Sequence, residues 1–167
     1  MRRGLPAALA LALAACTSGD AASCPGEPVG TWLFTVTGTF YPDGVPALFC
    51  EKPAQDASQV VGAFRGTLSS DPSLGTAALC IQGAGDLGQP YFGRVEAGVY
   101  TLNAVAGLAV LTRCGANCSA SAALRIQGEV TAAGFEGTLT ETFTAPQGDC
   151  GACAFPCEKT YGLEGVP

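Results

Sequence analysis

Apolar and polar residues alternate along most of this chain with a period of two. Over residues 31–41, Trp32, Phe34 and Val36 fall on one side, and threonines occupy the other. The same alternation returns over residues 135–144, again with threonines opposite bulky apolar residues. A two-residue period with β-branched threonine on the polar side is typical of antiparallel strands that bury one face.

The pattern predicts an all-β fold. We find no helical periodicity longer than about two turns. The expected strands lie at 31–41, 59–69, 76–82, 90–96, 98–104, 107–113, 120–130 and 135–144. Short links at Ala97-Gly98, Val105-Ala106 and residues 131–134 require antiparallel neighbours. This favours an up-and-down barrel of about eight strands, with a β-sandwich as the alternative. The segment 146–167 shows no clear strand and is expected to be stapled to the barrel.

The first sixteen residues have a different pattern. Arg2 and Arg3 precede an apolar run that ends in Leu13-Ala14-Ala15-Cys16. Positive charge followed by a short apolar core is typical of a secretory signal, and the run is short for a membrane span.

Leu-Ala-Ala-Cys resembles the lipobox of bacterial lipoproteins. The resemblance implies that Cys16 is lipidated and becomes the mature N-terminus, so that the lipid anchors the protein in the cell envelope. Thr17 after the cysteine mildly favours the outer membrane. We therefore divide the chain into a signal peptide (1–15), a lipidated tether (16–28) and a single β-domain with a cysteine-rich tail (29–167).

The charge of the mature chain limits the classes of partner that it can bind. Without Arg2 and Arg3, six basic residues face fourteen acidic ones, which gives a net charge of −8. No basic cluster is present, and phosphate binding needs lysine and arginine gathered on one face. We therefore expect no nucleic-acid partner. The sequence indicates one partner, the membrane, which the protein reaches through its lipid. Whether the protein also binds another protein or a small molecule is left open by the sequence.

Cysteine is abundant, and its count fits export. Without Cys16, eight cysteines remain: Cys24, Cys50, Cys80, Cys114, Cys118, Cys150, Cys153 and Cys157. An even number in an exported domain predicts disulfides, although the sequence leaves 105 pairings open. A thiolate zinc site or a redox pair at Cys150 and Cys153 is the alternative. An oxidising envelope and an all-β setting favour structural disulfides and no metal.

The first predicted strand begins Gly30-Thr31-Trp32, which resembles the Gly-x-Trp start of lipocalins and related calycin barrels. There the tryptophan packs across one end of an eight-stranded barrel, often beneath an arginine from the last strand. The predicted last strand here has no arginine, and the nearest candidate is Arg125. The resemblance implies a carrier of a small apolar ligand, whose cavity would be lined by Trp32, Phe34, Phe64 and Phe143.

Few residues of the chain support a catalytic function. The chain contains no histidine, so Ser-His and Cys-His arrangements are absent. A carboxylate-dependent hydrolase stays open, since Glu129 could approach Glu136 across a hairpin, while Glu136 and Glu141 fall on opposite faces. The Gly83–Gly88 run has dinucleotide-loop spacing, but a strand-like segment follows it where a helix is needed, so no cofactor is expected.

The leading interpretation is a lipid-anchored envelope protein with a non-enzymatic binding or structural role. The alternatives are the calycin-type carrier and, less favoured, the hydrolase. Protein binding through exposed aromatic residues at Tyr41, Tyr91 or Phe155 is a further option.

Overall fold

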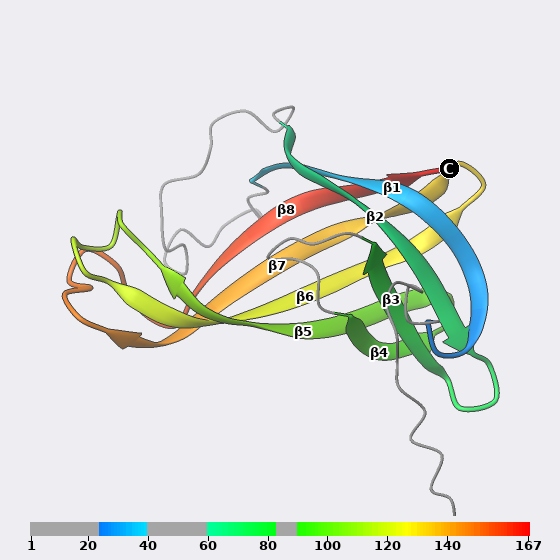
Figure 1. Ribbon diagram of the computed structural model, residues 1–167, viewed down its shortest axis with the longest axis horizontal. Helices are drawn as coiled ribbons and strands as arrows, with labels where there is room; N and C mark the ends of the chain where they lie inside the picture. Colours follow the sequence, from blue (N-terminus) through cyan, green and yellow to red (C-terminus); the bar gives the residue numbers. More distant parts are fainter. Residues whose placement is uncertain (1–23, 40–59, 83–89) are drawn as a thin grey trace, which may run out of the picture.

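The computed structural model describes residues 24–39, 60–82 and 90–167, and all its regular elements are strands. Eight antiparallel strands follow one another around a closed barrel, and the last pairs with the first (Figure 1). They are β1 (Glu27–Thr39), β2 (Val60–Asp71), β3 (Thr76–Gln82), β4 (Tyr91–Glu96), β5 (Val99–Val110), β6 (Ser119–Thr131), β7 (Gly134–Gln147) and β8 (Cys157–Val166). The predicted up-and-down barrel is confirmed. In the described residues, no helix is long and apolar enough to cross a membrane.

Two-residue turns produce much of this topology. Ala97 and Gly98 join β4 to β5, and both have positive φ angles, 50° and 84°. Such turns match the right-handed twist of the flanking strands. Ala132 and Ala133 likewise join β6 to β7. Both hairpins lie where the sequence predicts them.

Two strand assignments from the sequence are wrong. Val105-Ala106 is no turn, because β5 runs on to Val110 with a bulge between Val105 and Gly107. The segment 146–167, expected to have no clear strand, contains β8, which pairs with β7 and β1 and closes the barrel. The predicted number of eight was therefore right because one split strand offset one missed strand.

The barrel wall is taller on one side than on the other. β3 and β4 have 7 and 6 residues, whereas β5, β6 and β7 have 12, 13 and 14. β5 pairs with β4 only up to Asn103, and beyond that point the sheet extends away from the barrel (Figure 1). We call this extension, built from residues 104–122 and 142–157, the disulfide arm.

The apolar residues form two separate clusters. The barrel core gathers the inward side chains of β1 to β8, with Phe34, Leu102 and Ile126 fully buried. A smaller cluster in the disulfide arm contains Leu111, Cys114, Cys118, Ala120, Ala122, Phe143 and Cys157. The alternation read from the sequence therefore identifies the buried faces correctly, but it does not show that they belong to two cores.

Disulfides hold the arm and the N-terminal segment in place. Cys114 bonds Cys153 and Cys118 bonds Cys150, which ties the β5–β6 connection to the β7–β8 connection. Cys24 bonds Cys80. Beside it, the buried Ser69 hydroxyl donates a 2.6 Å hydrogen bond to the carbonyl of Pro25, so the segment before β1 is fixed against β2.

Cys157 is also disulfide-bonded. The structure thus confirms the disulfide prediction for seven cysteines. Cys16 and Cys50 lie outside the described residues, as do Tyr41 and the Gly83–Gly88 run.

Candidate functional site: a groove beside the disulfide arm

The side chains predicted to line a ligand cavity are packed against other side chains. The Phe34 ring stacks on Phe64 with 5.1 Å between centroids, and it meets Trp32 and Phe135 edge-on at 6.1 and 5.6 Å. Phe143 lies in the other cluster, inside the disulfide arm. The fold therefore brings Trp32, Phe34 and Phe64 together in one buried aromatic cluster and places Phe143 apart from them.

The arginine considered in the calycin comparison faces away from this core. Arg125 is exposed on the outer face of β6, where its Nη2 donates a 3.1 Å hydrogen bond to Oε1 of Gln127. Trp32 packs instead against Phe34 and Phe135. The tryptophan of the Gly-x-Trp start thus has aromatic partners rather than this guanidinium.

A small polar group lies on the inward face between the two apolar clusters. Glu141 is directly opposite Leu124 on β6 and Lys159 on β8, which places it on the core side of the sheet. The Tyr161 hydroxyl donates a 3.2 Å hydrogen bond to Oε2 of Glu141, and Nζ of Lys159 lies 5.4 Å from the Phe143 ring centroid.

Tyr91 is the buried member of this polar region. Tyr91 is only 1% exposed, and its hydroxyl has no hydrogen-bond partner among the described residues. Burial, and secondly the negative charge of Glu141, raise the pKa of Tyr91 to about 12. The interpretation of Tyr91 as an exposed aromatic contact residue is therefore wrong, because its position opposite Leu79 in the β3–β4 ladder turns the ring into the core.

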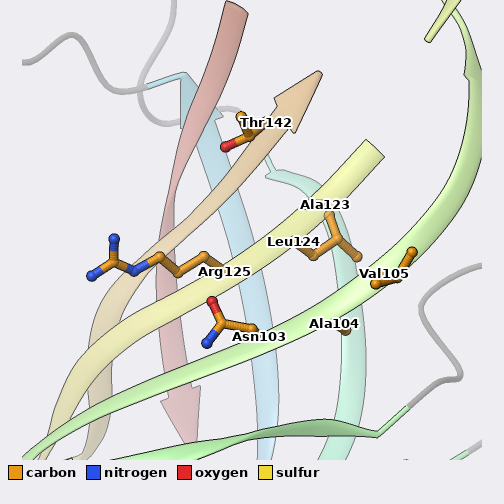
Figure 2. A pocket seen from close by; sticks show the side chains of 7 residues that line it. All are labelled: Asn103, Ala104, Val105, Ala123, Leu124, Arg125 and Thr142. Atoms are coloured by element: carbon orange, nitrogen blue, oxygen red, sulfur yellow. The ribbon is translucent and has the colours of Figure 1, made fainter. Parts of the chain in front are cut away.

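The described surface has an open groove where β5 leaves β4. Its volume is about 290 Å³, and Figure 2 shows the side chains around it. The lining comes from three adjacent strands: Asn103, Ala104 and Val105 of β5, Ala123, Leu124 and Arg125 of β6, and Thr142 of β7. Arg125 and Asn103 extend along one side of the opening in this view, while Val105 lies on the other.

The register of the sheet explains the groove. Val105 is paired with Ala123, and Ala123 with Thr142, so a small side chain lies between two larger ones on the outer face. Thr142 donates a 3.2 Å hydrogen bond to Oε1 of Glu158 on β8. The groove therefore offers a guanidinium, an amide and a hydroxyl around an apolar floor, which suits binding of a small polar group or a peptide side chain.

The carboxylates considered for hydrolysis lie on the surface. Glu129 and Glu136 are directly opposite each other across the β6–β7 hairpin, as predicted, and both are exposed. Glu141 lies on the other face of β7, also as predicted. Therefore no two of these three carboxylates lie together in a pocket formed by the described residues.

The cysteines also have a defined arrangement. Cys150 and Cys153 bond Cys118 and Cys114 rather than each other, which differs from a dithiol redox pair. In the described part of the chain, no group of three or more cysteine, aspartate and glutamate side chains is arranged to hold a metal ion. Phe155, a further aromatic candidate, is half-buried against the arm cluster.

Sequence reasoning missed the groove. The threonine face predicted over residues 135–144 includes Thr142, but nothing in the sequence shows that Val105, Ala123 and Thr142 are paired across three strands. The chain matches no known family model, and neither the curated proteins nor the solved structures contain a match to it.

Proposed function

We propose that this chain is a lipid-anchored protein of the cell envelope, held through Cys16, whose domain has a binding or structural role rather than a catalytic one. Its location is the outer membrane. The observation that carries the proposal is the apolar run ending in Leu13-Ala14-Ala15-Cys16.

The disulfides of the fold support an oxidising compartment. The described domain contains three complete disulfides, and these bonds persist mainly outside the reducing cytosol. The segment that precedes β1 is tied to β3 through Cys24–Cys80, so a lipid at Cys16 would be joined to a fixed point of the barrel by the seven residues 17–23.

The binding role is supported by the groove. Its polar groups come from Asn103, Arg125 and Thr142, and its lining contains no carboxylate, cysteine or histidine. Residues of this kind recognise a ligand through hydrogen bonds and charge, whereas general acid–base and covalent catalysis need titratable or nucleophilic groups close to the substrate.

The lipid is tested by expressing the full chain in a bacterium fed a labelled fatty acid. We expect label on the wild-type chain and none on Cys16→Ala, with mass spectrometry locating the acyl groups on residue 16. Cys24→Ala is the matched control, because it removes the next cysteine in the chain and should keep the label. A wild-type chain that is exported without label, or retained unprocessed in the cytoplasm, would contradict the proposal.

A further inference from the structure

In the disulfide arm, β5 has an edge with which no described strand pairs, and we call it the free edge. Its ladder with β4 ends at Asn103, opposite Phe92, while its ladder with β6 continues to Val110. From Ala104 to Val110, therefore, β5 is paired on one side, and no strand of the described residues pairs with the other. Unpaired backbone N–H and C=O groups in a row are a template for another strand.

The side chains along this edge are apolar and exposed. Val105, Leu108 and Val110 are 70%, 60% and 71% exposed. They lie opposite Ala123, Ser121 and Ser119 of β6, which places all three on the outer face of the arm. Proteins usually protect such an edge with lysine, proline or an inward charge, and Ala104–Val110 contains none of these.

We propose that this edge is a self-association site, where β5 of one molecule pairs antiparallel with β5 of a second copy. Charge favours this partner. The chain carries a net charge of −6, so most of its surface repels a second copy, but the seven residues from Ala104 to Val110 are uncharged. An antiparallel pair of identical strands is related by a two-fold axis, as in most homodimers.

The length of the edge also fits a second copy. β5 ends at Val110, and the chain then turns into the buried Leu111. In a pair centred on Leu108, Leu108 lies opposite the same residue of the other copy and Gly107 lies opposite Ala109, so inward residues match inward ones. Val110 of one copy then lies opposite Ala106 of the other, and the incoming strand ends short of β4. Leu108 and Val110 of both copies then lie on the same outer face as one apolar strip, and the Val105–Gly107 bulge lies at the end of the paired segment.

The groove described above is continuous with this edge. Val105 belongs to both, and Asn103 and Ala104 line the groove where the free edge begins. Side chains near the end of the second copy's β5 would therefore lie beside the groove. A five-residue strand pair is smaller than the roughly 1,200 Å² interface of stable complexes, so we expect a weak dimer.

The test uses the full chain with Cys16→Ser, so that no lipid drives association, and with its disulfides formed. Sedimentation over a wide range of protein concentration should show a monomer–dimer equilibrium. Leu108→Lys combined with Val110→Lys should weaken the dimer at least about tenfold, because it places like charges on the paired edge. Leu74→Lys, at a 73% exposed leucine between β2 and β3, is the matched control and should leave the dimer unchanged.

Hydrogen exchange identifies the paired backbone. Within residues 104–110, the amides that do not bond β6 should be unprotected in dilute protein and become protected as the dimer forms, whereas those of the Leu74 turn should not change. A chain that stays monomeric, or a dimer that the double lysine variant leaves intact, would overturn the proposal. Protection of the edge in the monomer would also overturn it, since a segment of the same chain would then cover β5.

Discussion

Gly30 and Trp32 explain why glycine comes two residues before tryptophan in β1. Both point into the barrel, and the indole of Trp32 folds back over Gly30 so closely that a Cβ there would overlap ring atom Cζ2. The Gly-x-Trp pattern has, in this chain, a packing reason that does not depend on any ligand.

Gly30→Ala should lower the free energy of unfolding by about 1–3 kcal/mol, because the added methyl displaces a ring that is packed on Phe34 and Phe135. Urea denaturation measures the change. Gly62→Ala is the control, since nothing lies within 4 Å of the position of its Cβ. Equal effects of the two substitutions would show that the loss of glycine flexibility, rather than the indole, decides the result.

The buried hydroxyl of Tyr91 is expected to lower the stability of the folded protein. A buried hydroxyl without a partner loses its hydrogen bonds to water and gains none in return. Tyr91→Phe should therefore raise the free energy of unfolding by about 1 kcal/mol in urea denaturation at neutral pH. Tyr161→Phe should do the reverse, because it removes the hydrogen bond to Glu141. Destabilisation by Tyr91→Phe would mean that the hydroxyl has a partner.

The same side chain predicts a loss of stability at alkaline pH. The pKa of Tyr91 is raised from 10.0 to about 12 in the folded state, so above pH 10 the unfolded chain releases this proton first. The contribution of the protonated Tyr91 side chain to the free energy of unfolding is fully present below pH 10 and is lost as the pH rises toward 12. At roughly pH 11 the wild type should have lost about 1 kcal/mol more than Tyr91→Phe, measured by urea denaturation at matched pH values. Parallel pH profiles of the two proteins would contradict this assignment.

At the scale of elements, the disulfide arm depends on its cross-links. Its cluster is small, and Cys114 and Cys118 are fully buried members of it. The Cys114–Cys153 bond joins residues 39 apart, and a disulfide closing a loop of this size contributes about 2–4 kcal/mol.

Replacing Cys114 and Cys153 together by serine should destabilise the packing of the arm locally without unfolding the barrel. Hydrogen exchange should accelerate across residues 109–122 and stay slow at Leu102 and Ile126, which belong to the barrel core. The intact Cys118–Cys150 bond serves as an internal reference, because it should keep the two connections of the arm together. Global unfolding of the double variant would show that the arm and the barrel fold as one unit.

The strands differ in how well the sequence predicts them. β1, β6 and β7 were predictable because bulky apolar residues alternate with threonine and other polar residues over long runs. β8 was not, because Lys159 occupies an inward position and glycines at 162 and 165 interrupt the alternation. β5 looked like two strands because the Val105–Gly107 bulge shifts the alternation by one residue.

The groove and the free edge were beyond the sequence for a related reason. The groove depends on the pairing of Val105, Ala123 and Thr142 across three strands, and the free edge depends on where β4 begins relative to β5. The register between two strands cannot be read from either strand alone. The expectation of a barrel, confirmed by the structure, could not show that one side of its wall is taller than the other.

At the scale of the whole molecule, the two ends differ in role. β1 begins at Glu27, paired with Ser70 next to the β2–β3 turn, at the opposite end of the long axis from the disulfide arm (Figure 1). A lipid attached at Cys16 would therefore hold the barrel end near the membrane and direct the arm away from it. The free edge of β5 would then stay accessible to a neighbouring copy anchored in the same membrane, where shared attachment raises the effective concentration.

Because the two clusters lie in one continuous sheet, their independence can be tested from the barrel side as well. Phe34→Ala should destabilise the barrel by about 3–5 kcal/mol, since the ring is fully buried among Trp32, Phe64 and Phe135. Phe34 belongs to the barrel cluster alone, and two disulfides close the arm, so arm amides near Ala120 and Ala122 should remain protected while those near Leu102 exchange faster. Hydrogen exchange at partial urea denaturation separates the two responses. If arm and barrel lose protection together in this variant, the strands β5 to β8 transmit unfolding between the clusters, and the molecule has one cooperative core.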